Sequence, residues 1–248
     1  MSFERSFIGT GVGAEPGPSA GSAGAGQADT VTPAMRLQIL STEHWSLLAS
    51  RALAWNESFS RAGMFLTTLT GAIVALALVA QASTFGEGFT LFALVILPVV
   101  LFIGVATAIR LGASNYHEAM CVIGMNRIRA AYLELAPDLE RFFVMSAHDD
   151  LRGMGITMGV QPGGGRLFWW AQIIAGTPTV VSILNSVLAG VIAALVALRL
   201  GADASMVLGV GLLGFVVAAA LQILYASRRV AKVWSRLTPR FPTLAAKP

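Results

Sequence analysis

The sequence has little charge. Only 12% of its 248 residues are Asp, Glu, Lys or Arg, whereas 55% are hydrophobic and the mean hydropathy is +0.71. Soluble domains carry about 25% charged residues. An aqueous globular protein of this length could not bury so much apolar surface, so we expect lipid to solvate much of the chain.

Cysteine is almost absent, and so is any sign of an export signal. Cys121 is the only cysteine, which excludes a disulfide within one chain and a cysteine metal cluster. The N-terminal region contains Glu4, Glu15 and Asp29 and has no continuous apolar core before Arg36. These features are not those of a signal peptide.

Recognisable catalytic motifs are also missing. The glycine-rich "QPGGGR" is not preceded by a predicted strand or followed by Gly-Lys-Ser/Thr, so it is not a phosphate-binding loop. The chain has no Gly-x-Ser-x-Gly and no His-Glu-x-x-His. We therefore expect no enzymatic activity and no cofactor.

Four long apolar stretches are what the sequence does have. A helix needs about 20 apolar residues to cross about 30 Å of hydrocarbon. The stretches predict an all-α integral membrane protein with four transmembrane helices, paired as two hairpins, first with second and third with fourth, and carrying cytoplasmic helical extensions. The predicted spans are 62–83, 88–110, 177–198 and 204–227.

The other segments have distinct compositions. Residues 1–33 are rich in Gly, Ala, Ser and Pro and cannot bury enough apolar surface to fold, so a disordered tail is expected. The remaining predictions are a cytoplasmic amphipathic helix at 34–61, a cytoplasmic helical segment with a glycine-rich loop at 111–167, an interfacial aromatic lead-in at 168–176 and a basic C-terminal tail at 228–248.

The basic residues predict the orientation. The short loops "QASTFGEG" and "GADAS" contain no Lys or Arg, and only Arg199 lies at the rim of the second. All other Lys and Arg residues lie in the N-terminal region, in 110–166 or in the C-terminal tail. The positive-inside rule then puts both termini in the cytoplasm of a bacterium, with the chain in the inner membrane.

Two helical segments outside the spans share a spacing of alternating three and four residues. The first segment, before the first span, follows it at Trp45, Leu48, Ala52, Trp55 and Phe59, and the second, after the second span, at Cys121, Met125, Ile128, Tyr132 and Leu135. This spacing is typical of a packed helix pair, and we expect the two segments to pair antiparallel in the cytoplasm. The alternative is that the first segment lies flat on the membrane through its Trp residues.

Small and polar residues mark the spans. Stripes of small residues let membrane helices approach closely, which predicts a compact bundle and subunit contacts; the positions are Gly63, Gly71, Gly104, Ser186, Gly190 and Gly214. Asn185 and Gln222 are polar residues in the cytoplasmic half of the bilayer. The outer half is almost wholly apolar, so one subunit has no visible polar route across the membrane.

His148, Asp149 and Asp150 are the one cluster of metal-ligand residue types. Adjacent residues on a helix point in different directions, so the triplet cannot converge on one ion without irregular backbone. The preferred interpretation is that Ser146 caps a short helix and that the two acids occupy its first turn.

The C-terminal segment "RRVAKVWSRL" predicts a basic amphipathic helix on the inner leaflet, attracted to anionic lipid. Its cations are Arg228, Arg229, Lys232 and Arg236. The alternative is a stop-transfer anchor that serves orientation alone.

The runs "LSTEHWSLLASRALAWNESFSRAGMFL" and "GMNRIRAAYLELAPDLERFFV", followed by "HDD", resemble an uncharacterised family of bacterial four-helix integral membrane proteins. The likeness implies no particular activity. A looser architectural likeness is to SLATT-type membrane effectors, in which cytoplasmic helices flank a membrane hairpin that is thought to make pores. The second hairpin departs from that pattern.

Together these features predict a non-enzymatic bacterial inner-membrane scaffold that oligomerises or binds a partner through its cytoplasmic helices. The expected partners are membrane lipid and either another copy of the chain or a cytoplasmic protein, with no nucleic acid. The alternative is an oligomeric pore, channel or transporter, because a hydrophobic constriction can gate by dewetting.

Overall fold

The computed structural model describes residues 31–84, 86–159, 176–235 and 237–243, and these ranges contain helices and no strand. Four of the helices are long and apolar enough to cross a membrane, which confirms the expected all-helical class and four candidate spans. The elements are α1 (Pro33–Ser83), α2 (Glu87–Leu135), η1 (Pro137–Phe142), α3 (Leu151–Thr157), α5 (Thr177–Arg199) and α6 (Ala204–Trp234). Residues 1–30, Arg236 and all but the last residue of the predicted lead-in at 168–176 lie outside the described ranges.

Two of the helices are much longer than a bilayer is thick. α1 has 51 residues and α2 has 49, which correspond to about 77 Å and about 74 Å of helix. α1 begins after Thr32, whose side-chain oxygen accepts a hydrogen bond from the backbone N–H of Met35 at 3.3 Å. The segments 34–61 and 62–83, which were predicted separately, therefore belong to one unbroken helix.

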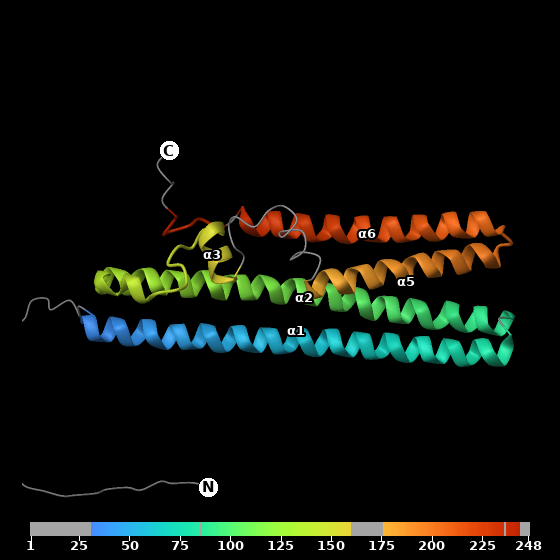
Figure 1. Ribbon diagram of the computed structural model, residues 1–248, viewed down its shortest axis with the longest axis horizontal. Coiled ribbons are helices and arrows are strands. Elements are labelled where there is room, and N and C mark those ends of the chain that lie inside the picture. Colours follow the sequence, from blue (N-terminus) through green and yellow to red (C-terminus); the bar gives the residue numbers. More distant parts are fainter. Residues whose placement is uncertain (1–30, 85, 160–175, 236, 244–248) are drawn as a thin grey trace, which may run out of the picture.

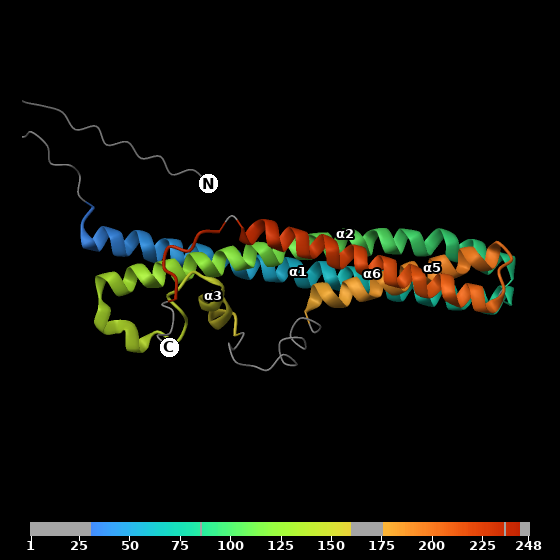
Figure 2. The same ribbon diagram turned by 90° about the horizontal axis from the view of Figure 1, so that it is seen from above.

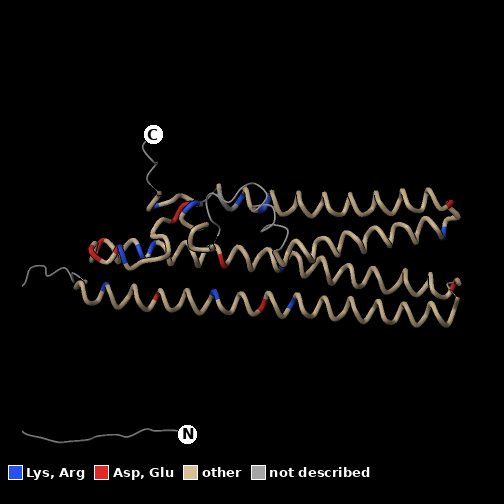
Figure 3. Tube along the Cα trace, viewed as in Figure 1, with Lys and Arg blue, Asp and Glu red and all other residues tan. Residues whose placement is uncertain are grey.

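The long helices run roughly parallel to one molecular axis. α1 and α2 lie side by side along their length, α5 and α6 form a second adjacent pair, and α5 packs against α2 (Figures 1 and 2). α1 and α2 extend far past the start of α5, so one end of the molecule has four helices and the other has mainly two. The charged residues are concentrated at the two-helix end (Figure 3).

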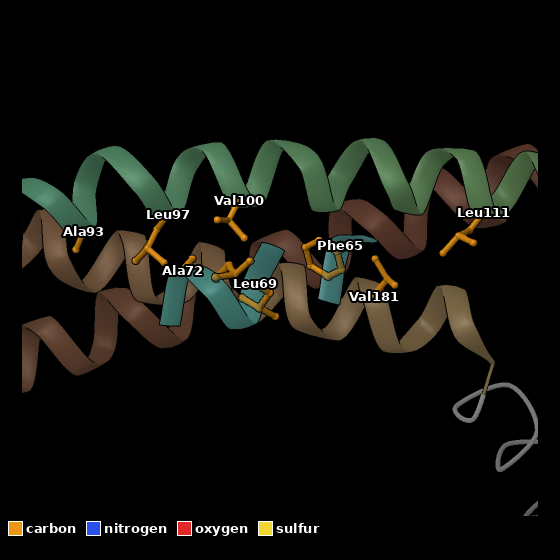
Figure 4. Close-up of a cluster of buried hydrophobic side chains, with 9 residues drawn as sticks. Phe65, Leu69, Ala72, Ala93, Leu97, Val100, Leu111 and Val181 are labelled. Carbon is orange, nitrogen blue, oxygen red and sulfur yellow. The ribbon is translucent and has the colours of Figure 1, made fainter. Parts of the chain in front are cut away.

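The apolar core lies where α1, α2 and α5 meet. Phe65 of α1 is fully buried, and Val100 of α2 and Val181 of α5 are each 1% exposed. Figure 4 shows these side chains between the three helices. The outward faces carry many exposed apolar side chains, among them Phe102 and Leu208. Such surfaces exceed the isolated patches that an aqueous monomer normally shows.

Several of the predicted small residues permit close helix packing. A methyl group added at Gly104 of α2 would overlap the Asn185 side-chain oxygen of α5 and the ring of Phe65. Between α5 and α6, a Cβ atom added at Gly190 would lie 2.8 Å from the Gly211 carbonyl oxygen, and one added at Gly214 would lie 2.8 Å from Ala193 Cβ. Larger residues would separate these backbones.

The first small-residue stripe does not pack within the chain. A Cβ atom added at Gly63 or Gly71 would meet nothing within 4 Å, so the prediction is wrong for contacts inside one molecule. The face of α1 that meets α2 instead contains Ala62, Phe65 and Ala72. Contacts of Gly63 and Gly71 with another subunit stay a prediction.

Candidate functional site

The halves of α1 and α2 that lie outside the predicted spans are joined by specific polar pairs. The Arg51 guanidinium on α1 bonds to one oxygen of the Glu118 carboxylate on α2, with an NH2–Oε1 distance of 2.9 Å. One and two turns further along, the Ser58 hydroxyl donates to the Ser114 hydroxyl at 2.8 Å, and Ser114 in turn donates to the Ala54 carbonyl oxygen at 2.9 Å. These bonds fix which face of α1 meets α2.

The α1 residues expected in this interface are on the wrong face of the helix. Trp45, Leu48, Trp55 and Phe59 are 67%, 40%, 56% and 57% exposed, respectively. Four of the residues that do contact α2 each precede one of them by one position, and a one-residue shift corresponds to about 100° around a helix. The contacting residues include His44, Leu47, Arg51, Ala54 and Ser58.

The α2 side of the same pair agrees better with the sequence. Met125 and Ile128 are buried, as a packed seam requires. Tyr132 is half-buried, and its ring lies 6.4 Å from that of His44 on α1. The expected pairing of the two segments is therefore seen, with the predicted α2 residues and a different set of α1 residues.

We call Trp45, Leu48, Trp55 and Phe59 the outer seam. Their side chains form a stripe on α1 that is rotated away from α2, and the Trp55 and Phe59 rings contact each other edge-on at 5.2 Å. Apolar residues at the three–four spacing form the seam of packed helix pairs, and Trp is enriched among the residues that dominate protein–protein interfaces. α1 therefore carries two neighbouring stripes, of which α2 covers one.

The acids of the "HDD" triplet form hydrogen bonds with other parts of the chain. Asp149 accepts bonds from Arg127 Nε at 2.7 Å and from the backbone N–H groups of Arg240 at 2.9 Å and Phe241 at 2.8 Å. Its own N–H donates to the Phe241 carbonyl oxygen at 3.2 Å. Among the residues that the structure describes, no group of three or more His, Cys, Asp or Glu side chains is arranged to hold a metal ion.

Asp150 extends the same contact to the next residues of the chain end. Its carboxylate accepts the backbone N–H of Thr243 at 2.7 Å and the Thr243 hydroxyl at 3.0 Å. It also caps α3, because it accepts the Gly153 N–H at 2.7 Å. The capping residue is therefore Asp150 and not Ser146, whose hydroxyl accepts the His148 N–H at 3.0 Å.

We call Arg127, Asp149 and Asp150 the tail clamp. Burial by itself raises the pKa of each carboxyl, but the hydrogen-bond donors outweigh it, so the pKa of Asp149 and that of Asp150 both lie below the ordinary value of 3.8. Both groups are thus carboxylates at neutral pH. They attach residues 240–243 beside α3, as both ribbon views show (Figures 1 and 2).

Sequence reasoning missed the residue that positions this loop. Asn126 of α2 is fully buried. Its amide nitrogen donates to the His148 carbonyl oxygen at 2.8 Å, and its oxygen accepts from Arg129 at 2.7 Å and from the Thr157 hydroxyl at 2.9 Å. The available signal was an Asn between Met125 and Ile128, since a polar residue on a buried face needs partners.

The predicted intramembrane polar residues link α5 to α6. Asn185 is fully buried, and its amide nitrogen lies 3.5 Å from Gln222 Oε1, at the outer limit of a hydrogen bond. Gln222 Nε2 donates more closely to Ser186 Oγ at 3.0 Å and to the Ser182 carbonyl oxygen at 3.1 Å. Ser186 itself is 1% exposed. These residues form a helix-to-helix polar contact of the kind that stabilises membrane bundles.

The predicted basic segment continues α6 and does not form a separate helix. Arg228, Arg229 and Lys232 are exposed on the last turns of α6, which ends at Trp234, and Arg236 lies outside the described residues. Arg229 donates to the Tyr225 hydroxyl at 3.1 Å. In the described part of the chain, none of the three cations forms an ion pair with an acid.

No protein-family model, curated protein or solved structure matches this chain.

Proposed function

We propose that the protein is a non-enzymatic scaffold of the bacterial inner membrane that binds another protein molecule through the outer seam of α1. Both termini and the two-helix end lie in the cytoplasm, and the four spans form two hairpins. The observation that carries the proposal is the exposure of Trp45, Leu48, Trp55 and Phe59 at interface spacing on a face that α2 leaves uncovered.

The continuity of α1 argues against the membrane as the covering of the outer seam. Trp45 precedes Ala62, the first residue of the predicted span, by 17 positions, which is about 25 Å of helix. For the Trp45 side chain to lie on the bilayer, the helix would have to bend near Ala62. α1 instead runs unbroken from Pro33 to Ser83, which supports a seam that projects away from the membrane.

The chemistry of the outer seam suits a helical partner. Trp residues dominate many interfaces, and truncating one at the centre of a contact typically costs about 2 kcal/mol or more. Because the two stripes on α1 are about 100° apart, α1 can pack against α2 and a third helix at once. The partner is a helix of a second copy or of a cytoplasmic protein.

The alternative of an oligomeric pore has less support. Apart from Arg110 at the end of the second span, the four predicted spans contain no Asp, Glu, Lys, Arg or His. Gln222 is occupied in the contact between α5 and α6. Without ionisable groups aimed at a shared axis, the geometry favours the scaffold.

Disulfide crosslinking in native membranes tests the proposal. Leu48→Cys places a thiol on the outer seam, and Leu53→Cys, at a position that is 69% exposed on another face of α1, is the matched control. If the partner is a second copy, we expect a crosslinked dimer for the Leu48→Cys variant and none for Leu53→Cys. If the partner is another protein, we expect a native complex that is lost in the double variant Trp45→Ala/Trp55→Ala and kept in Leu53→Ala. A chain that stays monomeric in membranes, with no complex for the double variant to weaken, would contradict the proposal.

A further inference from the structure

A groove of about 610 Å³ runs between α2, α5 and α6. Its walls are mostly apolar at one end, where Leu101 and Val105 of α2 face Ala218 and Leu221 of α6. The volume lies within the range of about 300 to 1,000 Å³ that small-molecule sites occupy. The groove is thus large enough for a ligand and would take an apolar one along most of its length.

The opposite end of the groove is polar and positively charged. Arg229 lines it, together with Asn115, Tyr116 and Tyr225. The guanidinium of Arg229 donates one hydrogen bond to the Tyr225 hydroxyl and has no acidic partner in the described ranges. Its remaining N–H groups therefore offer donors to an anion, because a guanidinium carries five of them.

The two ends fall on either side of the predicted membrane boundary. Leu101 lies nine positions before Arg110, the end of the second span, and so about 13 Å deep in the hydrocarbon. Arg229 lies two positions beyond the end of the fourth span, at the level of the lipid headgroups. An inner-leaflet lipid has this same order of parts, with acyl chains in the hydrocarbon and phosphate at the boundary.

We propose that the groove binds one anionic phospholipid of the inner leaflet. The phosphate binds Arg229, with Asn115 beside it, and an acyl chain lies along the walls formed by α2 and α6. This inference rests on the proposed insertion in the membrane. It differs from a general attraction between basic residues and anionic lipid, because it assigns the binding to the cation that lines the groove.

The neighbouring cation supplies a matched control for the charge. Arg228 is also exposed on α6 but does not line the groove. Native mass spectrometry would measure retention of phosphatidylglycerol and phosphatidylcholine by the full chain in detergent. We expect preferential retention of one phosphatidylglycerol, roughly tenfold weaker in Arg229→Gln and nearly unchanged in Arg228→Gln, since hydrogen bonds between charged groups are strong.

Two glycines provide a second, charge-independent test. Gly112 lines the groove and Gly209 does not, and an added Cβ atom meets nothing within 4 Å at either position. Gly112→Leu should reduce lipid retention because its side chain fills the groove, whereas Gly209→Leu should retain the lipid. Both changes replace an exposed helical glycine by the same residue, so their effects on helix stability are matched.

The outcomes separate the lipid site from the membrane assignment. In a chain that fractionates with membranes, the lipid site would be overturned if both lipids were retained equally or neither were retained. It would also be overturned if Arg228→Gln and Arg229→Gln lost lipid equally, or if Gly112→Leu retained lipid fully. A chain recovered from the aqueous fraction without detergent would instead overturn the proposed membrane function.

Discussion

The tail clamp offers a prediction whose size follows from the geometry. The Asp149 side chain is fully buried and accepts three hydrogen bonds, two of them at Oδ2, from Arg127 and the Arg240 N–H. In Asp149→Asn the negative charge is lost and an NH2 group replaces one of the two carboxylate oxygens. Because both oxygens accept hydrogen bonds in the wild type, this NH2 group faces at least one N–H donor. The contact with residues 240 and 241 should therefore weaken.

The magnitude is set by the bonds that are lost and by the solvent that replaces them. A hydrogen bond to a charged group contributes about 1.5 to 3 kcal/mol. The Arg127 side chain is 33% exposed, so water can solvate its guanidinium once the carboxylate is gone. The summed energies of the hydrogen bonds therefore overstate the loss of stability. We expect a net cost of about 2 kcal/mol, which is roughly a 30-fold change in the attachment equilibrium.

Amide hydrogen exchange in detergent measures that change directly. The Arg240 and Phe241 amides should exchange roughly 30-fold faster in Asp149→Asn than in the wild type. The exposed acid Glu134, at the end of α2, provides a control, because Glu134→Gln removes the same charge outside the clamp. Unchanged exchange in Asp149→Asn, or an equal acceleration in Glu134→Gln, would refute the reasoning.

Two further predictions concern pH and packing. The pKa values of Asp149 and Asp150 lie below 3.8 in the folded chain. Attachment of residues 240–243 should therefore be complete above pH 3.8 and should be lost as the pH falls through the pKa values of the folded chain. Amide hydrogen exchange measured along an acid titration would reveal this loss. Gly104→Ala should lower the free energy of unfolding by about 1 to 3 kcal/mol, because the new methyl group overlaps Asn185 and Phe65. The methyl group of Gly112→Ala would enter open space, so the unfolding temperature in detergent should stay equal or rise. Equal losses of stability in the two variants would contradict this packing.

The sequence could predict the helices because length and hydropathy are properties of each segment alone. It could not predict which face of α1 meets α2. The large aromatic residues drew attention to the stripe with Trp45 and Trp55, yet the stripe that faces α2 includes Arg51 and Ser58. Polar residues enter such an interface when partners such as Glu118 satisfy them, and those partners lie far away along the chain.

The same limit applies to the glycines and to the "HDD" triplet. Spacing marks Gly71 and Gly104 as similar, but only the arrangement of helices decides that Gly104 meets Asn185 and that Gly71 meets nothing. Asp149 and Asp150 were recognised as a cluster of acids. Their hydrogen-bond donors include backbone N–H groups about 90 residues later in the chain. Backbone groups are the same in nearly every residue, so the sequence cannot indicate which of them will serve as donors.

The proposed topology has four helices that cross the inner membrane and both ends of the chain in the cytoplasm. Reporter fusions test it most directly: alkaline phosphatase joined after Ala202, between α5 and α6, should be active, and the same enzyme joined after Pro248 should be inactive, with the protein recovered in the membrane fraction. Active phosphatase behind Pro248, or a chain that stays in aqueous buffer without detergent, would contradict the account.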